Sequence, residues 1–245
     1  MTLKTKQRHV ENSIILIGIF SIIALSFSSP IKQNLEYHHF CDINKLFGIP
    51  NFHNVTSNIL FIVVGIYGLL KLNITSKLKP HYIILFIGII LTGIGSGYYH
   101  VNPNNTTLIW DRLPMTIVFM TILSIIIYEF INKKLGQTML IPALLIGVFS
   151  IFYWVIFKDL RFYAFVQFYP MITILIILIF SKSDTTNKLS YWLLFLMYIF
   201  AKTCEYFDEF IFNLLHSISG HTLKHIISSL GLALFIYIKK KIGFY

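Results

Sequence analysis

The sequence predicts an all-α fold: a polytopic transmembrane helix bundle with a seven-helix core and one additional N-terminal helix. Of the 245 residues, 56% are hydrophobic and only 12% are charged, and the mean hydropathy is +0.73. A soluble globular domain carries about 25% charged residues. The apolar residues also fall into blocks long enough to cross a bilayer, which takes about 20 of them. These blocks leave no room for a separate soluble domain.

Eight apolar segments are expected, near residues 13–29, 55–72, 82–100, 107–129, 138–157, 164–180, 189–207 and 220–238. The breaks between them contain the loop-forming residues Pro, Asn, Asp, Lys and Gly. Each segment should be a helix, because lipid cannot satisfy exposed backbone N–H and C=O groups and the segments are too long for barrel strands. We therefore expect an N-terminal cytoplasmic segment and extra membrane anchor in residues 1–36, and a seven-helix membrane domain in residues 37–245.

The first segment has a second interpretation, as a signal peptide, because basic residues precede it and Ser28-Ser29-Pro30 follows it. Its apolar run is long for that role and no A-x-A cleavage site follows, which favours a retained anchor.

The distribution of basic residues predicts the orientation. If the N-terminus is cytoplasmic and each segment crosses once, thirteen Lys and Arg residues lie in inner stretches and four in outer loops. The remaining three are Arg112, Lys202 and Lys224, which lie within segments. This bias is the one expected for cytoplasmic loops, and it places both termini inside. It also explains the net charge of +10 without a nucleic-acid partner.

Ionisable residues within membrane segments are costly and often mark function. In this topology His100 and Asp111 lie near the outer ends of their segments, and His221 and His225 lie in the first two turns of the last one. Ser96 lies one helical turn below His100. All five side chains are therefore expected at one depth near the outer leaflet.

The spacing of these residues suits a metal ion. Residues four apart share one face of a helix, so His221 and His225 can present their imidazoles to one ion. Three imidazoles and an open position are typical of catalytic zinc, which activates water at neutral pH. Asp111 would then transfer a proton, and Ser96 would donate a hydrogen bond to an oxyanion.

Two structural interpretations stay open at this point. Histidines in membrane helices also serve as helix–helix hydrogen-bonding residues, and Ser96 lies in Gly93-x-Gly95-Ser96-Gly97, which is typical of a small-residue packing face.

Three blocks of sequence resemble the alkaline ceramidase family, part of a wider superfamily of membrane hydrolases that includes the adiponectin-receptor-like proteins. They are Asn54-Val-Thr-Ser57-Asn58, then Gly95-Ser96-Gly-Tyr-Tyr-His100 with Trp110-Asp111-Arg112-Leu113-Pro114-Met115, and Gly220-His221-Thr-Leu-Lys-His225. The resemblance covers residues 37–238. It implies zinc bound by His100, His221 and His225, with Ser96 and Asp111 assisting hydrolysis of an N-acyl sphingoid amide to a fatty acid and a free sphingoid base.

The resemblance also implies a lipid substrate within the bilayer, with the active site near the outer side. Features shared with bacterial members place the chain in the bacterial inner membrane, with the site facing the periplasm. No obligate protein partner is evident from the sequence.

The calcium site of the eukaryotic members is poorly matched. Only Asp42 and Asn44 remain as plausible oxygen ligands in the corresponding stretch. Because Ca²⁺ takes six or more oxygen ligands, we expect no calcium site, or a weak one.

Five further polar residues are candidates for supporting roles. Asn54 and Asn58 are expected to hydrogen-bond the histidines. Glu205 and Asp208 are either partners of the ligand histidines or a solvated helix end. Arg112 either pairs with Asp111 or meets a lipid head group.

The sequence leaves two classes of function. One is a zinc-dependent hydrolase of ceramide or another acyl lipid. The other is a non-enzymatic receptor or lipid-binding scaffold with a structural zinc, which would normally have four protein ligands.

Overall fold

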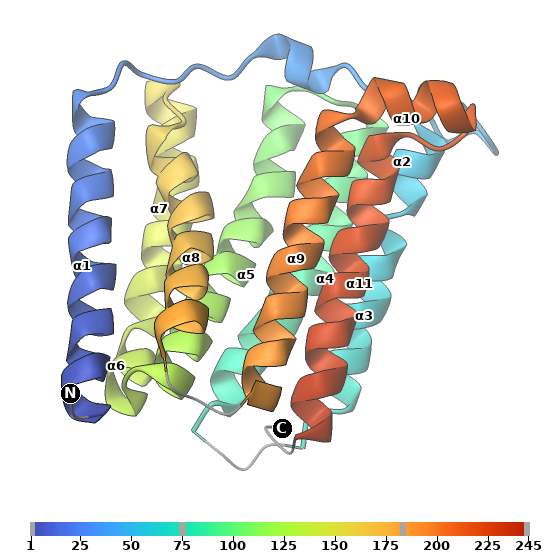
Figure 1. Cartoon of the computed structure of the whole chain (residues 1–245). Coiled ribbons are helices and arrows are strands. Elements are labelled where there is room, and N and C mark those ends of the chain that lie inside the picture. The colour runs from blue at the N-terminus through green and yellow to red at the C-terminus, as the bar shows by residue number, and fades with distance from the viewer. Residues whose placement is uncertain (1–2, 74–76, 182–184, 243–245) are drawn as a thin grey trace.

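A computed structural model describes residues 3–73, 77–181 and 185–242 of the chain. The described part is a bundle of helices that run alternately up and down (Figure 1). Its only β-pairing is an isolated bridge between Leu46 and Ile49. The helices are α1 (Leu3–Phe27), η1 (Leu35–His38), α2 (Phe52–Thr56), α3 (Ile59–Leu70), α4 (Lys79–Val101), α5 (Asn105–Phe130), α6 (Lys133–Thr138), α7 (Leu140–Phe157), α8 (Arg161–Phe180), α9 (Thr185–Tyr206), α10 (Asp208–Leu215) and α11 (Gly220–Lys241).

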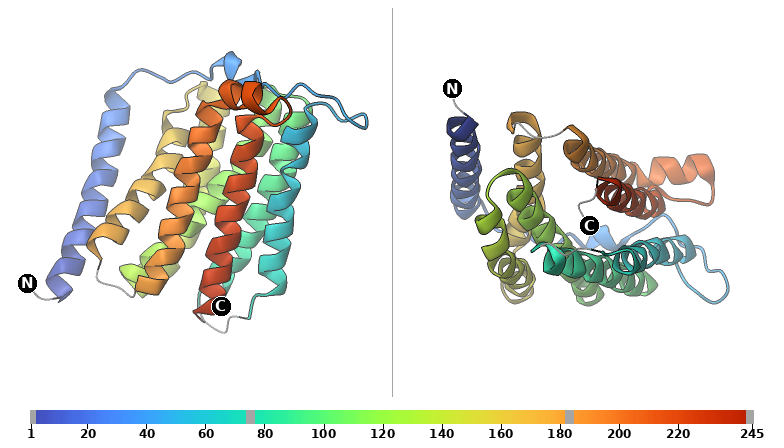
Figure 2. Two further views of the ribbon diagram at one scale, coloured as in Figure 1. Left: turned by 45° about the vertical axis from the view of Figure 1, so that its right-hand side comes forward. Right: turned by 90° about the horizontal axis from the view of Figure 1, so that it is seen from below.

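Within the described residues, seven spans are long and apolar enough to cross a membrane. The predicted all-α polytopic bundle is therefore confirmed. Helix α9 is not among the seven, since Lys188, Lys202 and Glu205 lower its hydropathy, but it packs along α11 in the same bundle (Figure 1). The first turn of α1 and the last turn of α11 lie at one end, as an even number of crossings requires (Figure 2).

The sequence did not anticipate every element. The predicted segment 55–72 begins earlier and is divided into α2 and α3, and the short helices η1 and α10 lie in stretches that were expected to be loops. Both lie at the end of the bundle opposite the termini (Figure 1). Lys182 is one of the thirteen basic residues expected in inner stretches, and it lies outside the described residues.

Two glycines let neighbouring helices approach closely. A Cβ atom on Gly95 would lie 1.9 Å from the carbonyl oxygen of Trp110, so α4 contacts the backbone of α5 there. A Cβ atom on Gly220 would lie 2.1 Å from the carbonyl oxygen of Cys204, so α11 contacts α9 in the same way. Each glycine directly precedes a candidate site residue, Ser96 or His221. The small residues therefore determine where these side chains lie.

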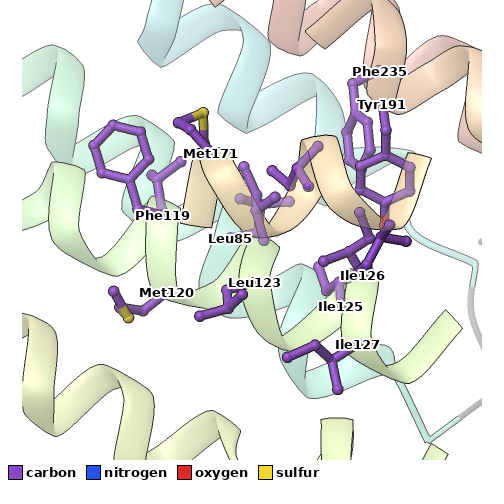
Figure 3. Close-up of a cluster of buried hydrophobic side chains, with 14 of the residues drawn as sticks. Leu85, Phe119, Met120, Leu123, Ile125, Ile126, Ile127, Met171, Tyr191 and Phe235 are labelled. Carbon is purple, nitrogen blue, oxygen red and sulfur yellow. The ribbon is translucent and has the colours of Figure 1, made fainter. Parts of the chain in front are cut away.

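A cluster of buried apolar side chains forms the core, and Figure 3 shows part of it. It joins Leu85 of α4, Phe119 of α5, Met171 of α8, Tyr191 of α9 and Phe235 of α11. These residues come from five helices, so the cluster fixes the helices that carry the candidate site relative to one another.

A buried polar network lies at the end of the bundle that holds the termini. The Lys239 ammonium, which is fully buried, pairs with Glu129 of α5 and donates to Asn187 of α9. The Tyr191 hydroxyl donates to Glu129 Oε2 at 3.0 Å. This network attaches the last turn of α11 to two other helices.

The additional N-terminal helix, α1, packs against α8. The Tyr169 hydroxyl donates to the carbonyl oxygen of Ile14 at 3.2 Å. At the top of α1, Arg161 donates to the carbonyl oxygen of Leu25 at 2.9 Å and also bonds Asp159. Thus α1 is held along its length by the helix that begins at Arg161.

Candidate metal centre

Three buried histidines meet at the end of the bundle that carries η1 and α10. His100 lies in the last turn of α4, and His221 and His225 lie in the first two turns of α11. Their exposed fractions are only 1%, 4% and 3%. The three ring centroids are separated by 4.8, 4.9 and 4.9 Å, and one nitrogen of each ring lies within 4.8 Å of the others. Among the described residues, this is the one group of histidine, cysteine and acidic side chains that is close enough to share a metal ion.

The separation of two of the ring nitrogens is close to that of two nitrogens bound to one zinc ion. His100 Nε2 and His221 Nε2 lie 3.2 Å apart. Two nitrogens bound at about 2.0–2.1 Å to a tetrahedral zinc ion are separated by about 3.3–3.4 Å. The third candidate atom, His225 Nε2, is buried without a hydrogen-bond partner in the described part of the chain. A buried nitrogen without a partner is costly, and a bound cation would satisfy it.

The opposite nitrogen of His225 is held by α2 and the start of α3. His225 Nδ1 lies 2.9 Å from the Ser57 hydroxyl, which donates to the carbonyl oxygen of Asn54 at 3.2 Å. Asn58 Nδ2 lies 3.3 Å from the same ring nitrogen. Metal-binding histidines typically have such a partner on the nitrogen that does not bind the ion. Asn58 was expected to hydrogen-bond a histidine and lies beside the His225 ring, whereas Ser57 was part of a quoted motif but had no assigned role.

Asn54 and Asp208 support the backbone of α11. The Thr222 hydroxyl donates to Asn54 Oδ1 at 2.7 Å, and the backbone N–H of His221 donates to Asp208 Oδ1 at 2.6 Å. The second contact satisfies a backbone N–H in the first turn of a helix, where such groups have no partner within the helix, and the first holds a side chain of the same turn. Asn54 and Asp208 therefore position the segment that carries His221, and neither side chain makes a hydrogen bond with a histidine ring.

Glu205 links His221 to two lysines. Its Oε1 accepts a hydrogen bond from Lys224 at 3.0 Å and lies 3.8 Å from His221 Nδ1, and its Oε2 pairs with Lys202. Lys224 Nζ lies 2.7 Å from His221 Nε2. Glu205 is therefore part of an ion-pair network and not a solvated helix end. The sequence placed Lys202 and Lys224 inside helices without assigning them to the site.

Ser96 and Asp111 line the same cavity as His225. This cavity has a volume of about 250 Å³, and its walls come from η1, α3, α4, α5, α8, α9 and α11. Ser96 and Asp111 lie next to the close contact between Gly95 of α4 and the Trp110 carbonyl of α5. Both side chains are buried, with exposed fractions of 3% and 8%. The structure therefore brings the two residues together, on the side of the histidines that faces an apolar space.

Arg112 does not pair with Asp111, its neighbour in sequence. The guanidinium instead lies against aromatic rings, with its central carbon 4.7 Å from the centroid of Trp154 and 4.9 Å from that of Tyr163. Such cation–π contacts are favourable, but Nη1 of the guanidinium is buried without a hydrogen-bond acceptor among the described residues.

The loop before α2 covers the histidines. The ring of Phe40 lies 4.7 Å from that of His100 and 4.4 Å from that of His221. Tyr37 of η1 borders the cavity over Arg112. The sequence offered no periodicity or motif that would have identified either residue, because their positions depend on the path of an irregular loop.

Asp42 is fully buried, and its carboxylate accepts the backbone N–H of Asn54 at 2.8 Å and that of Asn44 at 3.3 Å. His53 Nδ1 lies 3.6 Å from the same carboxylate. Asp42 thus anchors the start of α2. The contact of Asn44 with Asp42 is through its backbone. The expectation that these two residues form no calcium site, or only a weak one, stays a prediction.

The fold and the site together define a class: a polytopic membrane protein with three buried histidines beside a largely apolar cavity. A protein-family model described as Ceramidase matches residues 40–242. The chain therefore belongs to the Ceramidase family, which implies a membrane hydrolase that acts on amide bonds, and the resemblance expected from the motifs is confirmed. Comparisons with curated proteins and with solved structures give no match.

Proposed function

We propose that this protein is a zinc-dependent amidase that hydrolyses ceramide or a related N-acyl lipid to a fatty acid and a free amine lipid. The observation that carries the proposal is the group of three buried imidazoles, with one nitrogen of each ring within 4.8 Å of the others, bordering the cavity that contains Ser96 and Asp111. His100, His221 and His225 would hold the zinc ion. Bound zinc supplies a Lewis acid and makes water nucleophilic at neutral pH.

The remaining chemistry falls to side chains of the chain. Asp111 takes a proton as the oxygen of water bonds to the amide carbon, and it delivers a proton to the amine nitrogen as the C–N bond breaks. The Ser96 hydroxyl donates to the oxyanion that develops on the carbonyl oxygen. Both side chains line the cavity beside His225, so they are in place before substrate binds. The products are a carboxylic acid and an amine.

The apolar wall of the cavity is suited to an acyl chain. It includes Ile89, Phe119, Ile122, Met171 and Leu232. Burial of methylene groups against such residues stabilises the complex by about 0.8 kcal/mol for each group. The basic-residue bias would orient this end of the bundle towards the periplasm, with both termini in the cytoplasm.

The test is fatty-acid release from ceramide by the protein purified in detergent, with zinc measured by elemental analysis. We expect one zinc ion per chain. We expect Asp111→Asn to keep the zinc and lose at least about a hundredfold in kcat, the usual scale for removal of a general base. His221→Ala should lose both zinc and activity.

His39→Ala is the matched control, since His39 is an exposed histidine at the same end of the bundle that contacts Glu36. Its zinc content and activity should equal those of the parent. Full zinc occupancy without hydrolysis of any acyl lipid would reject the enzyme and support a structural zinc in a receptor or scaffold. Retained zinc in a folded His221→Ala protein would reject the ligand assignment.

A further inference from the structure

The polar end of the cavity carries an excess of positive charge. Its lining includes the cationic side chains of Arg112, Lys202 and Lys224 but only two acidic ones, Asp111 and Glu205. Both lysines pair with Glu205. Arg112 is thus the one cation of this lining that has no ion pair among the described residues.

Arg112 is more than nine-tenths buried, with an exposed fraction of 6%. It makes no hydrogen bond or ion pair with the residues that the structure describes, and its Nη1 is buried without a partner. Three aromatic rings surround the guanidinium, those of Trp154, Tyr163 and Tyr37, the last with its centroid 5.3 Å away. A buried charge without a partner destabilises a protein strongly. Because the unpaired Arg112 guanidinium lies in the wall of a ligand cavity, we infer that a group of the ligand supplies its partner.

The position of Arg112 indicates which part of the ligand supplies this partner. Asp111, the preceding residue, delivers a proton to the amine in the proposed reaction, and the apolar wall accommodates the acyl chain. A group bound by Arg112 would therefore belong to the amine half of the lipid. A guanidinium binds carboxylate or phosphate oxygens through two parallel N–H donors, which a hydroxyl group cannot match.

We propose that Arg112 binds a carboxylate or phosphate on the amine half of the substrate, so that the preferred lipid is an anionic N-acyl amine and not neutral ceramide. This inference rests on the proposed amidase function and specifies its substrate class. The acyl chain occupies the apolar wall, the amide lies beside Ser96 and Asp111, and the anionic group lies among the rings around Arg112.

Tyr37 completes this anion subsite from the loop that covers the cavity. Burial, with a further contribution from Glu205, raises the pKa of Tyr37 to about 12, so its hydroxyl keeps its proton at physiological pH. A protonated phenol adds an O–H donor next to the guanidinium. The Tyr37 hydroxyl makes no hydrogen bond within the described part of the chain, so this donor is available to a ligand.

The test compares N-palmitoylserine with N-palmitoylserinol, two amides of similar size in which a carboxylate of the first is replaced by a neutral hydroxymethyl group in the second. The parent protein should cleave the carboxylate with a kcat/KM at least about tenfold higher, since a hydrogen bond to a charged group corresponds to roughly a 10- to 100-fold effect. In Arg112→Gln this ratio should fall to about one, and in Arg112→Lys it should be intermediate. Tyr37→Phe, a change in the covering loop, should lower the ratio about threefold, and it tests the subsite if Arg112→Gln does not fold.

Lys32→Gln is the matched control, because it removes an exposed positive charge at the same end of the bundle without touching the cavity. The ratio of kcat/KM for N-palmitoylserine to that for N-palmitoylserinol should stay at the parent value. Equal ratios in the parent and in folded Arg112→Gln, or equal kcat/KM for the two amides in the parent, would overturn the anion subsite while leaving the amidase intact.

A binding measurement separates the two proposals. Hexadecyl phosphate should raise the Tm of the parent but not that of Arg112→Gln. Hexadecanol should raise the Tm of either protein by less than hexadecyl phosphate raises that of the parent. If that pattern appears but no acyl lipid is hydrolysed, the amidase function fails and the subsite stands. If inorganic phosphate stabilises the parent through Arg112 as strongly as hexadecyl phosphate does, the subsite binds a free anion and the proposed substrate class is wrong.

Discussion

Lys224 Nζ lies 2.7 Å from the Nε2 atom of His221, the same ring nitrogen that lies 3.2 Å from His100 Nε2. An ammonium group therefore borders the position where the three imidazoles would hold a cation. Glu205 partly compensates for it by pairing with Lys224. The charge on Lys224 thus opposes metal binding while it contributes to the positive potential of the cavity.

Lys224→Met should therefore tighten zinc binding. Two like charges about 4 Å apart repel by about 1–4 kcal/mol in surroundings between water and a protein surface. We expect the dissociation constant for zinc to fall about fivefold or more, measured by competition with a chromophoric chelator. Lys202→Met removes a charge from the same network without a contact to a histidine ring, so its effect should be smaller. Weaker zinc binding by Lys224→Met would show that the lysine supports the site.

Ser57→Ala should weaken zinc binding by about tenfold, because partners on the second nitrogen of a ligand histidine typically contribute 10- to 100-fold to metal affinity. The ring of His225 would lose its contact at 2.9 Å, while the fold should survive. Zinc titration and a thermal unfolding curve measure the two effects separately. Ser26→Ala, which removes an exposed hydroxyl in α1, provides the comparison. An unchanged affinity would mean that Ser57 does not orient the ring.

Two glycines of one motif should respond differently to the same change. Gly95→Ala places a methyl group against the backbone of α5 and should cost about 1–3 kcal/mol, as overpacking generally does. It should also lower kcat, since Ser96 and Asp111 lie on the two helices that must separate. In Gly97→Ala the nearest atom lies 3.8 Å away, so stability should stay close to that of the parent. Equal unfolding midpoints for the two variants would contradict the close approach of α4 and α5.

Acid should release α1 from the bundle. Burial alone would raise the pKa of Asp159, but hydrogen bonds from Arg161 and from the backbone N–H of Ile31 outweigh it and lower the pKa. A carboxyl group with a lowered pKa in the folded state stabilises that state above its unfolded pKa of about 3.9 and loses this contribution as the pH falls through the lower folded value.

Asp159→Asn should remove the stabilisation by the ionised Asp159 carboxylate at every pH above the unfolded pKa of the aspartate. We expect faster cleavage by a protease in the stretch near Ile31 at pH 7, with little change in zinc content. The parent should show comparable cleavage only at strongly acidic pH, with an acid-tolerant protease. Equal cleavage rates of the parent and the variant at pH 7 would contradict the role of Asp159 as the anchor.

The sequence predicted the features that depend on local pattern. Blocks of apolar residues predicted the helices, the basic-residue bias predicted that both termini share one end, and the four-residue spacing of His221 and His225 predicted a shared helix face. The depth of His100 followed from counting crossings. Each of these properties is determined by one segment or by the order of segments.

The remaining features depend on contacts between distant segments. Ser57 reaches His225 because α2 and α3 pack beside α11, and Phe40 covers the rings because an irregular loop crosses them. Arg112 was expected to meet either Asp111 or a lipid head group, and only the packing of Trp154 and Tyr163 shows that it does not pair with Asp111. No pattern within one segment carries this information.

Helix α11 is attached at both ends. Near its start, Thr222 bonds Asn54 and the backbone of His221 bonds Asp208, while near its end Lys239 pairs with Glu129. Sliding or rotation of α11 by even one residue would break all three attachments at once. The two histidines of α11 are therefore held in register with α2, α5 and α10, while Tyr37 and Phe40 belong to a covering segment outside the long helices.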